Sequence, residues 1–155
     1  MYEVFLFVHS WFRWIVVVAG LRLLFILLHG WIKKKKWDGS DQRALSLFNE
    51  VLSYQIAMGI CLYGFLSPLP KIGWSDMAFT LRDPILRFWT IEHITSMLSS
   101  IAIFHIGRAI ALKKAPLEKR FKVLSITLLL SMLLILSAIP WPFLKYGRDL
   151  FRIVF

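Results

Sequence analysis

The 155-residue chain has few acidic residues and a single cysteine. One cysteine, Cys61, cannot form a disulfide within the chain, so cysteine content does not identify a redox compartment. Asp and Glu number nine against 19 Lys and Arg, which leaves a formal net charge of +10. Internal repeats and low-complexity segments are also lacking. Apolar residues are instead abundant, at 58% of the chain compared with roughly 45–50% in ordinary soluble domains.

The apolar residues come in four long blocks, each long enough to cross a bilayer, which takes about 20 helical residues. The blocks are Val4–Leu28, Ala44–Leu66, Ile85–Leu112 and Val123–Ile139. With their flanking residues they predict helices over about 4–30, 43–66, 84–112 and 121–139. No stretch remains for a soluble domain. We therefore predict an all-α integral membrane four-helix bundle, with residues 1–155 forming a single transmembrane domain.

The first apolar block differs from a secretory signal peptide. It lacks a basic n-region, and Arg13 and Arg22 interrupt its apolar run. We expect it to be a retained membrane helix.

The basic residues cluster in two connections of the predicted bundle. Lys33–Lys36 follow the first helix, and a second basic group lies between Lys113 and Lys122, before the fourth helix. Both connections lie on the same side of the membrane. The positive-inside rule places them in the cytoplasm and both termini on the outer side. The net charge is thus a signal of topology, with binding of anionic lipid headgroups as a secondary effect, and no nucleic acid partner is expected.

The other side of the bundle carries fewer basic residues. The connection between the second and third helices has only Lys71 and Arg82 before Asp83. The C-terminal tail, with Lys145, Arg148 and Arg152, runs against the rule but is the weaker contribution.

Four polar groups fall inside the membrane at one depth. At about 1.5 Å per residue, counted from the outer helix ends, His9, Glu92, His93 and Arg13 lie about 9 to 15 Å into the membrane. Such groups are rare in the hydrocarbon region and usually face the bundle interior, paired or binding something. Arg13 is expected to face Glu92 or another anion, because an unpaired guanidinium is costly there.

Two histidines on facing membrane helices suit a b-type haem. Ligation by His9 and His93 would fill both axial positions of the iron, so the site would transfer electrons and not bind oxygen. Arg13 would neutralise the haem propionates, and Glu92 would tune Arg13 or bond an imidazole. A hydrogen-bonded polar cluster that packs the helices without any cofactor is the alternative. A metal site held by protein alone is less favoured, since only Glu92 accompanies the two histidines.

The remaining histidines do not match a second haem in the same chain. His93 and His105 are about 18 Å apart along their helix, whereas His9 and His29 are about 30 Å apart. His29 is expected to be an interfacial residue, and the role of His105 stays open. Arg22 is expected to reach the cytoplasmic interface, where it can pair with Glu50. One haem per chain is preferred.

Three motifs resemble a known family. "HSWFRW" in the first helix, "RFWTIEH" in the third and "AIPWPF" after the fourth resemble short four-helix bacterial membrane proteins catalogued as cytochrome B or cytochrome b subunit-like. The similarity follows nearly the whole chain in order and spacing. It implies that His9, Arg13, Glu92 and His93 match the histidine, arginine and glutamate–histidine positions of that family, and it supports a haem b cofactor.

The leading hypothesis is a cytochrome b-like subunit of the bacterial cytoplasmic membrane, which passes electrons between the quinone pool and a partner protein. Its expected partners are the lipid bilayer and other membrane subunits or a second copy of the chain. A cofactor-free accessory subunit of a larger membrane complex is the alternative, and a small protein that binds quinone or a lipid-like substrate is the third hypothesis.

Enzymatic activity of the chain alone is not expected, because no nucleophile–base pair is apparent. Haem predicts a slot between the imidazoles, packing predicts direct hydrogen bonds, and substrate chemistry predicts a lateral opening lined by Arg13 and Glu92.

Overall fold

The computed structural model describes residues 1–151, which are helical along most of their length and contain no strand. Four long helical stretches dominate, and they are α1 (Tyr2–Ile32), α2 (Gly39–Cys61) continued by the π-helix η1 (Leu62–Leu66), the π-helix η2 (Phe88–Glu92) continued by α6 (His93–Lys113), and α7 (Leu117–Ser137). The short helices α3 (Pro68–Ser75), α4 (Met77–Thr80) and α5 (Pro84–Arg87) connect η1 to η2. Each stretch agrees with a predicted helix to within a few residues.

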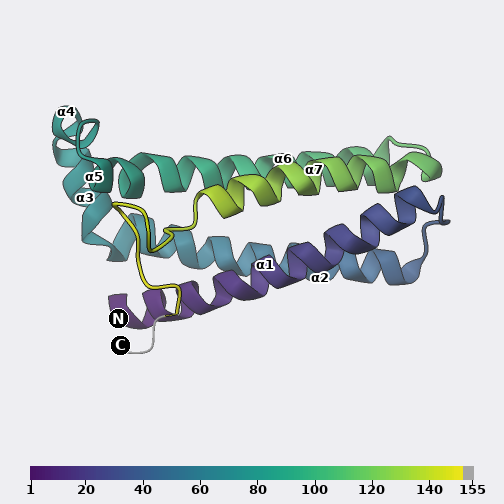
Figure 1. The fold of residues 1–155 in the computed structure, drawn as a ribbon, viewed down its shortest axis with the longest axis horizontal. Coiled ribbons are helices and arrows are strands. Elements are labelled where there is room, and N and C mark those ends of the chain that lie inside the picture. Colours follow the sequence, from purple (N-terminus) through teal and green to yellow (C-terminus); the bar gives the residue numbers. More distant parts are fainter. Residues whose placement is uncertain (152–155) are drawn as a thin grey trace.

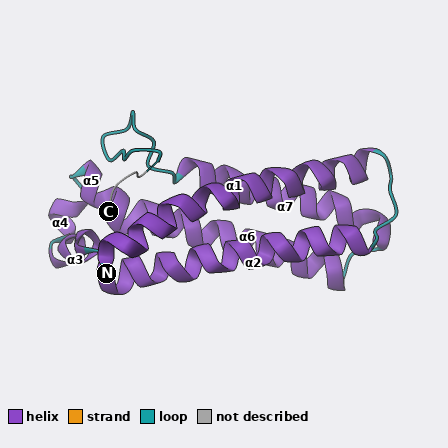
Figure 2. Cartoon of the chain, turned by 90° about the horizontal axis from the view of Figure 1, so that it is seen from below, coloured by secondary structure: helices purple, strands orange, loops and turns teal. Residues whose placement is uncertain are grey.

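The four stretches lie side by side as an elongated bundle in two layers (Figure 1), with α6 and α7 in one layer and α1 and α2 in the other. The N-terminus, the segment after α7 and helices α3 to α5 lie at one end of the bundle, here called the terminal end. The connections α1–α2 and α6–α7 lie at the opposite end, here called the basic end, as Figure 2 also shows. This arrangement brings the two basic clusters together, as the sequence predicts.

All four stretches are long and apolar enough to cross a membrane. Large apolar side chains such as Val18, Phe25 and Leu133 point outward and are more than half exposed. An apolar outer surface suits a lipid environment, in which every backbone polar group must be satisfied within the helices. The chain thus has the features of a multi-pass membrane protein.

Aromatic and aliphatic side chains fill the middle of the bundle and separate its two ends. Phe48 of α2 meets Phe104 of α6 edge to face, with ring centroids 5.0 Å apart. Leu27 and Leu128, from α1 and α7, are fully buried in the same core. This region is packed mainly by apolar side chains.

Capping residues fix where α2 and α5 begin. Asp83 accepts hydrogen bonds from the backbone of Ile85 and Leu86, and Pro84 occupies the first helical position, as is common at helix starts. At α2 the N-cap is Asp38, which forms a capping box with Asp41.

The two π-helical turns lie at the terminal end and contact each other. Tyr63 of η1 donates a hydrogen bond to the backbone oxygen of Thr90 in η2, at 2.7 Å. π-Turns inside α-helices are rare and frequently lie at functional sites. Here η2 ends directly before His93, so it sets the direction in which that side chain points.

Candidate functional site

A cavity of about 810 Å³ lies inside the terminal end of the bundle. Its volume is within the roughly 300–1,000 Å³ typical of small-molecule and cofactor sites. Helices α1, α2 and α6, the end of α7 and the segment after it all contribute to the walls. Its polar and aromatic lining includes His9, Arg13, Gln55, Trp89, His93 and Arg148. The structure therefore brings three of the four residues singled out in the sequence to one cavity.

His93 is held in a defined orientation at the start of α6. Its Nδ1 lies 2.9 Å from the backbone oxygen of Ala138, just beyond α7. Because a carbonyl can only accept, Nδ1 carries the proton and donates it, which leaves Nε2 for another partner. The rings of Phe88 and Trp89 flank the imidazole, with centroids 5.7 and 5.5 Å away. Metal-binding histidines are commonly oriented by such a bond from the other ring nitrogen.

His9 faces the cavity from α1 and contacts α2. Its Nε2 lies 3.4 Å from the side-chain nitrogen of Gln55, which also donates a hydrogen bond to the His9 backbone oxygen at 3.1 Å. A Cβ atom added at Gly59 would come 3.3 Å from His9 Cε1, so the small residue leaves room for the imidazole. The Nδ1 atom of His9 is buried and makes no hydrogen bond to the part of the chain that is described.

Arg13 lies one helical turn further along α1. Its guanidinium donates to the backbone oxygen of Leu150 at 2.8 Å, and its Nε is buried without a hydrogen bond to residues 1–151. The Oε1 atom of Gln55 is also buried without a hydrogen bond to residues 1–151. Buried polar atoms without partners are uncommon in proteins and call for an explanation. Three such atoms, on His9, Arg13 and Gln55, belong to described residues that line the cavity. They could form hydrogen bonds with a polar or charged ligand.

Glu92 does not take part in this arrangement. It pairs with Arg87 at 2.6 Å, and both side chains are about two-fifths exposed. The expected pairing of Arg13 with Glu92 is therefore not the one the structure shows. The reason is the π-turn η2, whose wider spacing brings residues five apart together and directs Glu92 away from the cavity.

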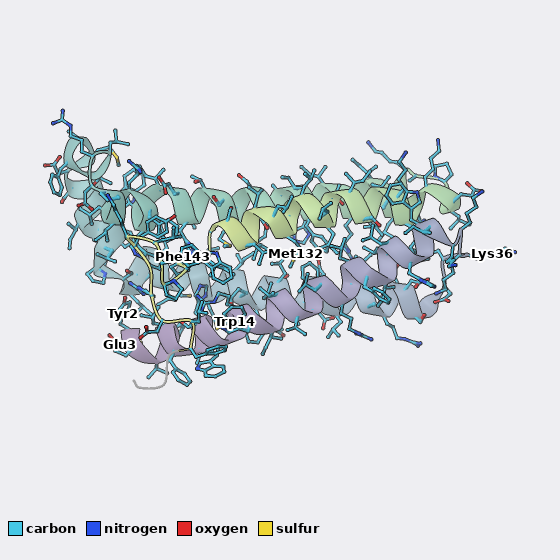
Figure 3. All side chains as sticks on the ribbon, in the orientation of Figure 1. Tyr2, Glu3, Trp14, Lys36, Met132 and Phe143 are labelled. Atoms are coloured by element: carbon cyan, nitrogen blue, oxygen red, sulfur yellow. The ribbon has the colours of Figure 1, made fainter. Side chains whose placement is uncertain are left out.

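The segment after α7 supplies residues that the sequence pattern did not indicate. Arg148 lines the cavity and lies over the ring of Trp89, with its guanidinium carbon 4.1 Å from the centroid. Phe151 stacks on Trp14, with ring centroids 5.5 Å apart, and Trp14 also donates to the Leu150 oxygen. Figure 3 shows Trp14 beside this segment and Tyr2 and Glu3 at the same end. The sequence signal for this segment was its basic charge. The positive-inside rule predicts few basic residues on the outer side of the membrane, where the segment is expected to lie.

The two other histidines lie outside the cavity. His29 stacks on Phe25 and borders a smaller hollow at the basic end together with Arg22 and Lys35. His105 makes an edge contact with Phe104. Within the described residues no ion pair joins Arg22 to Glu50, so the pairing expected from the sequence is not formed.

The cavity lining combines three kinds of group. Two imidazoles reach one cavity from different helices, two guanidiniums can meet carboxylates, and apolar side chains form much of the remaining wall. Among residues 1–151, no group of three or more His, Cys, Asp or Glu side chains is placed to hold a metal ion.

Compared with models of protein families, with curated proteins and with solved structures, the chain shows no significant match to any of them.

Proposed function

We propose that this chain is a cytochrome b-like membrane subunit that holds one haem b in the cavity at the terminal end. His9 and His93 would hold its iron, and Arg13 would meet a propionate. The subunit passes electrons between the quinone pool and a partner protein. Other membrane subunits or a second copy of the chain complete the electron path, because one haem near one face does not span the bilayer.

The meeting of His9 and His93 at one cavity carries this proposal. A cluster that only packs helices would bond its polar side chains to one another. Here His93 bonds a backbone oxygen, Arg13 bonds another, and His9 Nδ1 has no partner in the described residues. This pattern favours a ligand-binding site over the cofactor-free alternative.

The chain's own residues have separate roles in this proposal. A bound haem supplies a centre that gains and loses one electron. His93 is fixed through its bond to the Ala138 oxygen and presents Nε2 to the cavity. His9 offers the facing imidazole, and Gln55 positions it from α2. Trp89 and the apolar side chains of the lining lower the local polarity, which strengthens an electrostatic contact between Arg13 and a carboxylate.

The orientation and location of the subunit belong to the same proposal. The basic end faces the cytoplasm and the terminal end faces outward, in the cytoplasmic membrane of a bacterium. The cavity then lies near the outer face.

A lipid-soluble quinone is the second candidate ligand, because the cavity combines apolar walls with the hydrogen-bonding side chains of His9 and Gln55. Glu92 is not among the residues that line the cavity, so the carboxylate expected for substrate chemistry has to come from elsewhere. A quinone carries no carboxylate and gives the half-buried Arg13 no charged partner. Haem, unlike a quinone, would give both the imidazoles and the Arg13 guanidinium a partner.

The test is a visible spectrum of the protein purified in mild detergent from haem-replete cells. We expect a sharp reduced α-band of the b type at about one haem per chain, lost or strongly shifted in His9→Ala and in His93→Ala. His29→Ala is the matched control, since His29 lies at the basic end, and it should keep the band. A featureless spectrum in a well-folded wild type, or a band that survives both substitutions, would refute the proposal.

A further inference from the structure

The segment between α7 and Phe151 is folded into a fixed structure against the cavity. The Arg148 backbone nitrogen donates to the Pro140 oxygen at 3.1 Å, and the Gly147 nitrogen donates to the Leu144 oxygen at 2.8 Å. Any side chain at Gly147 would meet the backbone oxygens of Trp141 and Leu144, so the turn requires glycine. The Tyr146 ring stacks on Phe88, with centroids 3.7 Å apart and planes 9° from parallel. These contacts determine where Arg148 lies.

Arg148 and Arg13 line the same cavity from different parts of the chain. Arg148 comes two residues before Leu150, whose backbone oxygen accepts the hydrogen bond from Arg13. Both arginines are half-buried. The ring of Trp89 supports one face of the Arg148 guanidinium and leaves its N–H groups for acceptors in the plane.

The acidic side chains of this region lie further out. Glu3 and Asp149 also border the cavity, but both residues are exposed. Exposed carboxylates are well hydrated and screened by salt, whereas half-buried guanidiniums interact more strongly with a bound anion. The inner part of the cavity therefore attracts negative charge.

We propose that Arg13 and Arg148 together form a receptor for a ligand with two carboxylates, and that Arg148 is its second cation, contributed by the segment after α7. This inference rests on the proposed function, because the two propionates of haem b are the carboxylates in question. Arginine suits the task, since its planar fork can bond a carboxylate through two parallel N–H groups.

The test compares haem b with its dimethyl ester, in which both carboxylates are neutral. Both porphyrins are titrated into full-length apoprotein in detergent, and the dissociation constants are measured by absorbance. Charge-assisted hydrogen bonds of this kind change affinity by about tenfold or more. Arg148→Gln should weaken haem b binding by about that factor and leave the ester's affinity unchanged. Arg148→Lys should retain part of the preference for haem b.

Lys145→Gln is the matched control, since Lys145 is an exposed cation of the same segment and does not line the cavity. It should not change either affinity. Equal weakening of both porphyrins by Arg148→Gln would assign Arg148 a structural role only, and unchanged affinities would remove it from the site. Either result overturns this inference while haem binding stands. If neither porphyrin binds to a folded wild type, the proposed function itself fails, and the receptor fails with it.

Discussion

Buried polar residues of the bundle differ in whether they have hydrogen-bond partners. Ser100 of α6 and Ser131 of α7 are buried and bond each other at 2.9 Å between their hydroxyl oxygens. His9 and Arg13, in contrast, keep buried nitrogens that make no bond to residues 1–151. The serine pair satisfies itself and holds two helices together. The histidine and arginine have capacity for a further partner, which is why we assign them to binding and the serines to packing.

The serine pair gives a prediction at this scale. Ser100→Ala or Ser131→Ala leaves one buried hydroxyl without its partner and should lower the free energy of unfolding by about 1 kcal/mol. The double variant should cost less than the sum of the two, because neither hydroxyl remains unpaired. Reversible unfolding in mixed detergent micelles measures all three. Ser137→Ala is the control, since Ser137 is exposed and its hydroxyl donates to the Leu134 oxygen within α7. Additive losses would show that the bond contributes nothing beyond the separate hydroxyls.

At the scale of elements, the start of α2 is the best-defined helix end outside the membrane. Asp38 accepts bonds from the backbone nitrogens of Ser40 and Asp41, and it also pairs with Lys35 at 2.9 Å. The hydrogen bond from the Ser40 hydroxyl and the Lys35 ammonium hold the pKa of Asp38 well below its usual value. A depressed pKa means that the ionised cap stabilises the folded state.

This stabilisation depends on pH in a direction that can be predicted. It is fully present above about pH 4, the ordinary aspartate pKa, and is lost as the pH falls through the lower folded value. Asp38→Asn keeps a capping oxygen but cannot titrate. The wild type should therefore have the higher thermal midpoint near pH 7, and the difference from Asp38→Asn should shrink towards pH 3. Asp38→Ala should melt below both near pH 7. A difference in thermal midpoint between the wild type and Asp38→Asn that does not change with pH would contradict a stabilising role for the ionised cap.

The approximate bounds of the long helices followed from the lengths of the apolar blocks, whereas the directions of side chains at the terminal end did not. The third helix was predicted from about residue 84, and α5 begins at Pro84. Depth counting placed His9 and His93 in one layer, and both line the cavity. It could not foresee the π-turn at which Glu92 bonds Arg87 and Tyr63 bonds the Thr90 oxygen, because depth counting assumes a regular α-helix. The path of the segment that carries Arg148 likewise depends on contacts distant in sequence.

At the scale of the whole molecule, the two ends of the bundle differ in chemistry. The terminal end holds the cavity and the folded segment after α7, while the basic end holds the lysine runs, with Lys36 at its tip in Figure 3. Apolar packing around Phe48 and Phe104 separates them. A redox or binding site near one membrane face therefore has access to partners on that side only. Which side it faces is decided by the orientation of the chain.

The orientation is testable because the chain has one cysteine. In a Cys61→Ser background, Lys36→Cys places a thiol at the basic end and Lys71→Cys places one in α3 at the terminal end. The positive-inside rule predicts that a membrane-impermeant maleimide labels the second in intact cells and the first only after the membrane is opened. Spheroplasts are needed if an outer membrane blocks the reagent, and the Cys61→Ser parent serves as the unlabelled control. The reverse pattern would place the cavity near the cytoplasmic face, and a redox partner would then have to be a cytoplasmic protein.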